Sequence, residues 1–533
     1  MDEKIGQRLL LAFHGKDDVP DGFRAALKAY KPAGVTLFRS LNIENPRQVR
    51  ELTKRLQAAA LEAGLPPLLI AVDQEGGQLM AIGNGTTPLP GNMALGATRD
   101  RSLARRAGEI LGTELRAMGV NVNYAPSCDV NINPHNPAIG IRSFGEDPLE
   151  VGEMASAMIE GMQSRGVAAT AKHFPGHGDV ASDSHYGLPM LRHDLNRLQQ
   201  VEFPPFQAAI RAKTKLIMTA HLALPAIDGP DAPPATLSPT VLKGLLRSQL
   251  GFDGVIITDA MDMQAIPQGA ALGANAVRAA AAGADLLLLT SDPADQQRVF
   301  ESLRHAAQDD SLLMRDMDVS LERIASLKHW LTDQPEAPAL DMVGCAAHQE
   351  VADEIARRSM TLVRNEAGLL PLRSAPGRRV AAIVPKPSDL TPADTSSYVA
   401  PTLAAALRAY HPQVDELSVG NAPSHDEIAE LVQRVRRYDL VVLGTLNAFN
   451  QPDQQALVSA ILGTGIPTVL VAMRLPYDLA SVPEAQTTVC TYSILEPSMR
   501  ALAAALSGVK AFEGQLPVSI PGLYPAGFGI GAS

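Results

Sequence analysis

The sequence predicts an α/β protein that combines an N-terminal (β/α)8 TIM-type barrel with a C-terminal three-layer α/β sandwich. Short apolar runs alternate with alanine- and leucine-rich amphipathic segments through the first 330 of its 533 residues. There are eight such runs, the number that a (β/α)8 barrel of about 250 residues requires. Polar residues capable of chemistry end several different runs, as at a barrel mouth.

The eight expected strands are almost continuously apolar, as are strands of a parallel sheet that helices cover. An open doubly wound sheet is the alternative, but its ligand site would draw on fewer strands. The amphipathic patterns between runs include residues 100–118 and 275–284. The expected strands lie at residues 7–13, 34–38, 68–73, 120–126, 167–174, 215–221, 254–259 and 285–290.

A domain boundary is expected where the sequence becomes rich in proline and loses its helical period. We predict a barrel over residues 1–331, a linker over 332–345 and a second domain over 346–533. In the second domain apolar runs again alternate with helical patterns, which predicts a mostly parallel sheet between two helical layers. These runs occupy residues 378–385, 439–445, 467–473 and 486–493.

Composition excludes several classes of function. A formal net charge of −11 disfavours nucleic acids and anionic membranes as partners. Cys128, Cys345 and Cys490 form neither a disulfide framework nor a metal-ligand spacing. No apolar run has the length of a membrane span, and the N-terminal run is too short for a signal peptide. We therefore expect a cytoplasmic protein, or a secreted one if a leader was removed.

The segment from residue 172 to residue 185 is unusually dense in titratable groups. It contains one lysine, three histidines and two aspartates together with two glycines and a proline. The Asp183-x-His185 spacing lets a carboxylate orient an imidazole and raise its basicity, which prepares a histidine for general acid/base catalysis. A polar loop without chemistry is one alternative. Metal binding is another, but the glycines and the lack of a helical histidine pair favour neither metal nor cofactor.

Strand ends supply further candidates. Asp73, Lys172, His173, His221 and Asp259 each end an expected strand, where a barrel builds its active site. Taken alone, Asp259 would suit a helix N-cap, but the other polar residues at strand ends favour an active-site role for it.

Two of the candidates have individual alternatives. Asp73 precedes a Gly76–Gly77 turn and could bind neutral hydroxyl groups, or simply belong to the turn. Arg142, in the loop 131–148, could reach the mouth as a rigid fork of donors, or pair on the surface with Glu146 or Asp147.

Taken together, these segments resemble glycoside hydrolase family 3, in its β-N-acetylhexosaminidase branch. The resemblance rests on KHFPGHGDVASDSHYGLP (172–189), supported by AVDQEGG (71–77), residues 125–148 and GFDGVIITDAMDM (251–263). RRSMTLVRNEAGLLPL (357–372) and GQLPVSIPG (514–522) resemble the family's second domain.

The resemblance implies a role for each candidate residue. Asp259 becomes the catalytic nucleophile, His185 the general acid/base and Asp183 its partner. The sugar binders are Asp73, Arg142, Lys172 and His173, and we expect His221 beside them. A retaining exo-β-N-acetylglucosaminidase without a cofactor follows, acting on a carbohydrate from cell-wall muropeptides, as in peptidoglycan turnover, or from chitin.

Three alternatives stay open at this point. Phosphate could replace water as the acceptor, the enzyme could prefer another sugar, or the chain could bind sugars without catalysis. The family pattern EGGRVxR is broken by Gln78 and Ala81, which bears on the choice of sugar. The polar segment 388–398 of the second domain is a candidate to reach the barrel mouth.

Overall fold

The first domain is a closed barrel of parallel strands in the computed structural model, which describes residues 1–309, 311–375 and 377–531. A parallel bridge between Ile257 and Leu286 joins the first and last strands of the sheet, so the barrel prediction is confirmed. The eight strands, in order around the barrel, are β10 (Leu287–Leu288), β1 (Leu9–Leu11), β2 (Gly34–Thr36), β3 (Leu69–Val72), β6 (Val122–Asn123), β7 (Ala168–Phe174), β8 (Leu216–Thr219) and β9 (Val255–Ile257).

Every residue of these strands is buried, which explains their continuous apolar character. Alternate side chains such as Leu10, Leu69 and Leu216 fill the barrel interior. Their neighbours, for example Leu9 and Ile70, pack against the surrounding helices. The interior is therefore a solid core, and the site must lie above the strand ends.

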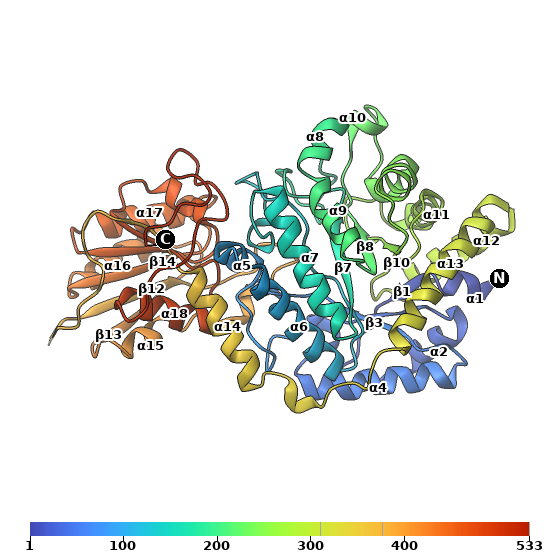
Figure 1. Ribbon diagram of the computed structural model, residues 1–533, viewed down its shortest axis with the longest axis horizontal. Helices are drawn as coiled ribbons and strands as arrows, with labels where there is room; N and C mark the ends of the chain where they lie inside the picture. Colours follow the sequence, from blue (N-terminus) through green and yellow to red (C-terminus); the bar gives the residue numbers. More distant parts are fainter. Residues whose placement is uncertain (310, 376, 532–533) are drawn as a thin grey trace.

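Helices follow the strands and cover the barrel, as Figure 1 shows. Several begin at side-chain caps that the sequence supplies, such as Asn45, Asp100 and Asp147. A short hairpin of β4 (Gln74–Gly76) and β5 (Leu79–Met80) follows β3. The helices of this domain are α1 (Asp2–Gly6), α2 (Asp21–Tyr30), α3 (Arg39–Asn42), α4 (Pro46–Glu62), α5 (Asn92–Thr98), α6 (Arg101–Ala117), α7 (Pro148–Ser164), α8 (Leu195–Gln200), α9 (Phe203–Arg211), α10 (Pro225–Asp228), the π-helix Thr240–Gln249, α11 (Leu272–Ala282), α12 (Pro293–Asp309) and α13 (Ser311–Thr332).

The second domain is a six-stranded sheet between helices, so the three-layer prediction is confirmed (Figure 1). Across the sheet the order is β11 (Thr361–Asn365), β16 (Thr487–Cys490), β15 (Thr468–Ala472), β14 (Leu440–Thr445), β12 (Val380–Pro385) and β13 (Val414–Val419). Helices α16 (His425–Val435) and α17 (Pro452–Leu462) lie on one side, and α15 (Leu403–Arg408) and α18 (Glu496–Leu506) on the other.

Two edge strands of this sheet were not expected from the sequence. β13 alternates buried and exposed side chains, so it lacks the continuous apolar run of an inner strand. β11 pairs antiparallel with β16 and is interrupted by a bulge, and its last two residues are only partly buried. Both strands lie at edges, where a polar face is tolerated.

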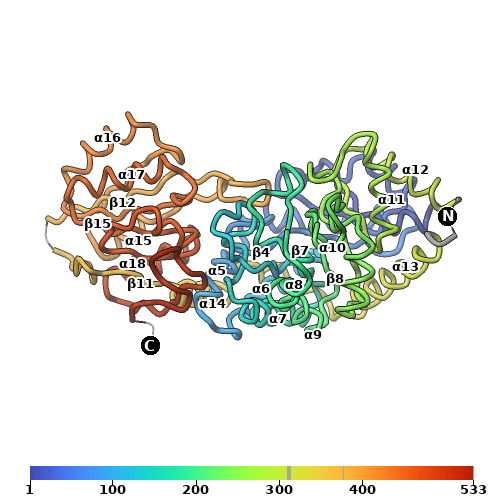
Figure 2. The backbone as a smooth tube through the Cα atoms, turned by 90° about the horizontal axis from the view of Figure 1, so that it is seen from above, coloured from blue at the N-terminus to red at the C-terminus, as the bar shows by residue number. Residues whose placement is uncertain are grey.

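The two domains lie side by side along the long axis of the molecule (Figures 1 and 2). Helix α14 (Ala346–Ser359) joins them by packing on α5 and α6. Ion pairs of Arg106 with Glu354 (2.7 Å) and of Arg358 with Asp100 (2.6 Å) cross the same contact. The exact domain boundaries stay predictions. Within the described ranges, no helix is both long and apolar enough to cross a bilayer.

Candidate active site

A cavity of about 440 Å³ opens at the C-terminal ends of the barrel strands. Both domains line it, because the segment after β12 reaches over the barrel mouth (Figure 2). Of the eight residues predicted from the sequence, six line this cavity: Asp73, Arg142, Lys172, His173, His185 and Asp259. Asp183 lies directly behind His185, and His221 lies outside the lining.

Asp183 and His185 form a hydrogen-bonded pair at the cavity. His185 Nδ1 lies 2.6 Å from Asp183 Oδ1, and the same oxygen accepts the backbone N–H of His185 at 2.9 Å. Burial opposes ionisation of Asp183, but the hydrogen bond and the proximity of His185 outweigh it, so the pKa of Asp183 lies below its usual value. With Nδ1 committed to the carboxylate, Nε2 is the nitrogen left for the cavity.

The residue between the two is held from both sides. Ser184 Oγ lies 3.2 Å from His177 Nε2, and the Ser184 carbonyl accepts the Ala265 N–H at 3.2 Å. Burial lowers the pKa of His177 to about 4, so this ring is neutral near pH 7. His177 therefore supports the loop and does not line the cavity.

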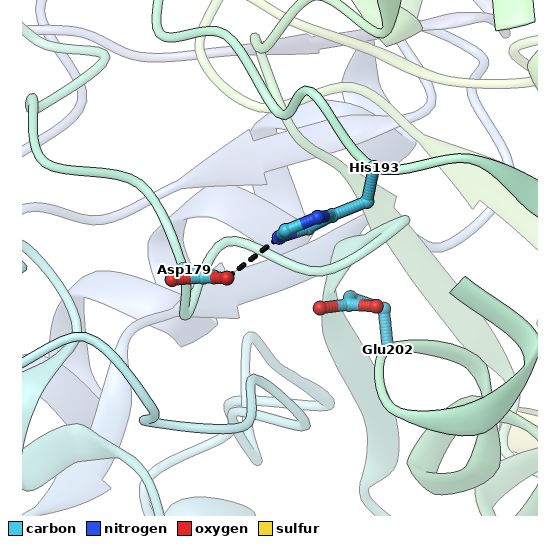
Figure 3. Close-up of side chains that lie close together, drawn as sticks. All are labelled: Asp179, His193 and Glu202. Carbon is cyan, nitrogen blue, oxygen red and sulfur yellow. Dashed lines mark hydrogen bonds and ion pairs between the residues drawn. The ribbon is translucent and has the colours of Figure 1, made fainter. Parts of the chain in front are cut away.

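The base of the loop is closed by Asp179, His193 and Glu202, which lie together in Figure 3. His193 Nε2 is 2.6 Å from Asp179 Oδ2. One nitrogen and two carboxylates within 4.8 Å of one another could hold a cation. Arg197 already provides one, since its Nη2 lies 3.5 Å from Asp179 and 3.6 Å from Glu202. We therefore interpret the cluster as a clamp on the two ends of the loop.

Asp259 lies two residues after β9 and lines the cavity. Its Oδ1 accepts the N–H of Ala260 at 2.8 Å, and the next helix, α11, begins only at Leu272, so Asp259 is not an N-cap. Burial opposes its charge, but His221, His173 and His185 outweigh burial and keep the pKa of Asp259 below its usual value. The group is an anion near pH 7, as a nucleophile should be.

The ring of His221 lies outside the cavity lining, although the sequence leads us to expect it beside the sugar binders. Its side chain is fully buried and both ring nitrogens bond to protein. Nε2 donates to the Ala260 carbonyl at 3.0 Å, and Nδ1 lies 2.7 Å from Thr236 Oγ1. His221 thus fixes the turn that carries Asp259. The sequence predicts that His221 lies near the end of a strand, but it does not predict the direction in which the side chain points.

Lys172 and Arg142 are fixed by a carboxylate that the sequence did not single out. Glu75 Oε1 lies 2.7 Å from Lys172 Nζ, and Arg142 donates to both Glu75 oxygens, at 2.8 and 3.1 Å. Burial opposes the charge of Glu75, but the two cations lower its pKa to about 2. Lys172 Nζ also donates to Asp73 Oδ1 at 2.7 Å.

This network excludes the surface alternative for Arg142. Arg142 is only 5% exposed. Its suggested surface partners are occupied elsewhere, since Glu146 accepts from Ser519 and Asp147 caps α7.

Asp129 is the second carboxylate that sequence analysis missed. It is fully buried, and its Oδ2 lies 2.7 Å from His173 Nδ1. Its Oδ1 accepts the backbone N–H groups of His173 (3.2 Å) and His177 (2.6 Å). Asp129 therefore fixes the tautomer of His173 and directs Nε2 away from itself. The sequence did contain a clue to Asp129, because this aspartate comes just after the expected strand 120–126 and other acidic residues follow expected strands in the same way.

The second domain holds its loop in place through Gln78. The Gln78 carbonyl accepts the N–H and the hydroxyl of Thr395, at 2.9 and 2.8 Å. Arg474 donates to Gln78 Oε1 at 2.5 Å and to Asp394 Oδ2 at 3.0 Å. The prediction that residues 388–398 reach the mouth is confirmed, because Asp389, Thr395 and Tyr398 line the cavity.

Comparison with known families agrees with this geometry. Residues 1–327 match the glycosyl hydrolase family 3 N-terminal domain, and residues 360–524 match the family 3 C-terminal domain. The chain is 31% identical to a beta-hexosaminidase A from Pseudoalteromonas piscicida, over 97% of this chain and 96% of the relative.

Solved structures give the same assignment. A family 3 beta-N-acetylglucosaminidase from a Paenibacillus species superposes with a TM-score of 0.91 at 36% identity, over 97% of this chain and 98% of the other. A beta-glucoside phosphorylase superposes with a TM-score of 0.80 at 26% identity, over 97% of this chain and 93% of the other. The chain therefore belongs to glycosyl hydrolase family 3 and is a glycosidase.

Proposed function

We propose that this glycosidase is a retaining exo-β-N-acetylglucosaminidase that removes terminal β-linked N-acetylglucosamine from cell-wall muropeptide or chitin-type fragments. The observation that carries the proposal is the Asp183–His185 pair at a cavity that the anionic Asp259 also lines. The names of the Pseudoalteromonas and Paenibacillus relatives support the choice of sugar.

In the first step Asp259 attacks the anomeric carbon while the bond to the leaving oxygen breaks. His185 Nε2 delivers a proton to that oxygen, so the leaving group departs as a neutral alcohol. The Nδ1–H of His185 stays hydrogen-bonded to the Asp183 carboxylate, and this negative charge stabilises the imidazolium before the proton is transferred. The product is a glycosyl ester of Asp259 and a neutral His185.

In the second step water attacks the same anomeric carbon and Asp259 leaves as a carboxylate. His185 Nε2 takes the proton from that water, which restores the imidazolium. Two inversions at one carbon give overall retention. The low pKa of Asp259 suits both steps, because the group acts once as an anionic nucleophile and once as a leaving group.

The terminal sugar is expected to lie among Asp73, Lys172, Arg142 and His173. Lys172 and Arg142 are almost fully buried and already paired, so their free donors are fixed in direction before substrate arrives. Charge-assisted hydrogen bonds from such groups suit sugar hydroxyls.

A panel of aryl β-glycosides tests the function. We expect the N-acetylglucosaminide to be cleaved at a much higher kcat/KM than the glucoside or xyloside, with a β-configured first product by NMR. Preference for the glucoside would contradict the sugar assignment, and an α-configured first product would contradict retention.

A phosphorylase is the second candidate, favoured by the 26% identity to a beta-glucoside phosphorylase and by an acid/base that is neutral when the acceptor arrives. A neutral imidazole does not repel an anionic acceptor as a carboxylate would. Product analysis with and without inorganic phosphate decides between them. If sugar-1-phosphate is the main product, the enzyme is a phosphorylase and the proposed hydrolase activity is wrong.

A further inference from the structure

A guanidinium and an aromatic ring, one from each domain, meet at the rim of the cavity. Arg39, the first residue of α3, lies with its guanidinium carbon 4.0 Å from the ring centre of Tyr398, and both line the cavity. Arg39 Nη1 donates to the Met80 carbonyl at 2.9 Å. In the described part of the chain this is the one hydrogen bond that Arg39 makes with protein, so its other N–H donors are available to a ligand.

The position of Arg39 relates it to the broken EGGRVxR pattern. Gln78 is engaged by Arg474, and the Ala81 side chain leaves space at the cavity wall. The Arg39 guanidinium lies against this same stretch, since a Cβ atom on Gly83 would come within 2.4 Å of Nη1. A positive donor group is therefore present beside position 81, although it comes from another strand end.

The Arg39–Tyr398 pair lies nearer the protein surface than the groups expected to bind the terminal sugar. Lys172 and Arg142 are 1% and 5% exposed, whereas Tyr398 is 57% exposed. An exo-acting enzyme holds the terminal sugar at the closed end of its pocket and lets the rest of the substrate point outward. The outer ring face and the free guanidinium donors suit the carbons and hydroxyls of a second sugar ring.

Charge indicates what kind of leaving group fits. Asp389, from the same loop as Tyr398, lines the same cavity as Arg39. Burial lowers the pKa of Arg39, and the nearby Asp389 opposes that shift only in part. Its two oxygens are held by the N–H and the hydroxyl of Ser397, both at 2.7 Å. A carboxylate and a guanidinium thus line the same rim of the cavity, which favours a neutral partner over an anionic one.

We infer that Arg39 and Tyr398 form the leaving-group subsite and that it selects a neutral, hydroxyl-bearing pyranose. The inference rests on the proposed function, since it presupposes an exo-acting glycosidase with Asp259 at the closed end. It narrows the two proposed substrate sources to chitin-type fragments.

Two substrates that differ only in the leaving group test the inference. We expect Arg39→Met to lower kcat/KM for N,N′-diacetylchitobiose roughly 10- to 100-fold, and to lower it far less for an aryl N-acetylglucosaminide, which has no second sugar. Tyr398→Ala should show the same selectivity. Arg47→Met, an exposed arginine on α4, is the matched control and should change neither value.

Gly83→Ala provides a variant that retains Arg39 but displaces its guanidinium. It should reproduce the loss on the disaccharide with an unchanged thermal unfolding midpoint. Equal losses on both substrates would place Arg39 at the terminal sugar, and no loss on the disaccharide would remove its role altogether. Both outcomes overturn the inference.

The neutral character of the subsite has its own measurement. If the wild-type enzyme prefers a disaccharide whose second sugar carries a lactyl carboxylate, and Arg39→Met abolishes that preference, the subsite recognises charge and the inference is wrong. Failure of the proposed function is distinguishable, because it appears in the wild-type enzyme as preference for the aryl glucoside. In that case the Arg39→Met and Tyr398→Ala variants are compared with the wild type on cellobiose and on the aryl glucoside.

Discussion

At this site each side chain with a proposed chemical role is held by a second side chain that positions it. Asp259 is positioned by the turn that His221 holds, and His185 is oriented by Asp183. His173 is oriented by Asp129 in the same way. Loss of a reacting group and loss of its partner should therefore differ in what they change.

Asp259→Ala should abolish turnover of every substrate, including aryl glycosides that need no acid, because Asp259 is the group proposed to form the covalent intermediate. His185→Ala should be far less damaging in the first step for substrates with good leaving groups. Rates across a series of aryl leaving groups measure this. An equal loss for all leaving groups would indicate a binding role for His185.

Glu75→Gln should destabilise the protein by about 3–5 kcal/mol near pH 7, because it leaves Arg142 buried without its carboxylate and Lys172 paired with Asp73 alone. The pKa of Glu75 falls from an ordinary 4.5 to about 2 on folding. The stabilisation is therefore fully present above about pH 4.5 and is lost as the pH falls toward 2.

Unfolding midpoints of the wild type and of Glu75→Gln, measured from pH 7 to pH 3, test this. The difference should be largest at pH 7 and shrink below pH 4.5. A constant difference would mean that Glu75 acts through packing and not through its charge.

The placement of Asp259, Asp183 and His185 at the cavity was predictable, because strand ends and short spacings are local properties of a sequence. Glu75 and Asp129 were not, since their role depends on which cation or imidazole lies opposite, 44 residues or more away in the chain. For His221 the strand end was predictable, but not the burial of its ring.

At the scale of elements, the loop after β7 carries the proposed acid/base pair and is held at its base and at its tip. Asp179 and His193 close the base, as Figure 3 shows, while Ser184 joins the tip to His177 and to Ala265. Such a loop can open locally without unfolding the barrel. The contacts at Ser184 should therefore govern how often His185 is in place.

Ser184→Ala should lower kcat/KM for substrates with poor leaving groups roughly 10-fold, because the hydroxyl contact with His177 is lost while Asp183 and His185 remain. Substrates with good leaving groups should be less affected. Ser102→Ala, on the exposed face of α6, is a control for the serine change itself. Equal losses for all leaving groups would exclude a positioning role for Ser184.

Elements were predictable where burial is continuous. The eight barrel strands and the strands β12, β14, β15 and β16 lie within apolar runs. β13 and β11 were not predictable in this way, because their edge positions allow polar side chains that interrupt the run.

At the scale of the molecule, the two domains share one cavity, and the contact that closes it is polar and buried. Arg474, which is 5% exposed, joins Gln78 of the barrel to Asp394 of its own domain. Two domains were predictable from composition. Their shared cavity was not, because it depends on side chains separated by 396 positions in the sequence.

Gln78→Arg should weaken this contact, since it introduces a second guanidinium opposite Arg474. We expect a lower unfolding midpoint and a raised KM, with recovery in the double variant Gln78→Arg/Arg474→Gln. A double-mutant cycle should give a coupling energy of about 0.5–3 kcal/mol. Additive effects would show that positions 78 and 474 do not act together.

The loop that reaches over the mouth has a consequence for how this enzyme can change over time. Residues 388–398 belong to neither the barrel wall nor the strands of the second sheet, and surface loops accept substitutions that cores reject. The residues proposed to break the glycosidic bond can thus stay the same while the sequence of the loop changes. New substrate preferences could arise by substitutions in a domain that takes no part in the bond-breaking step.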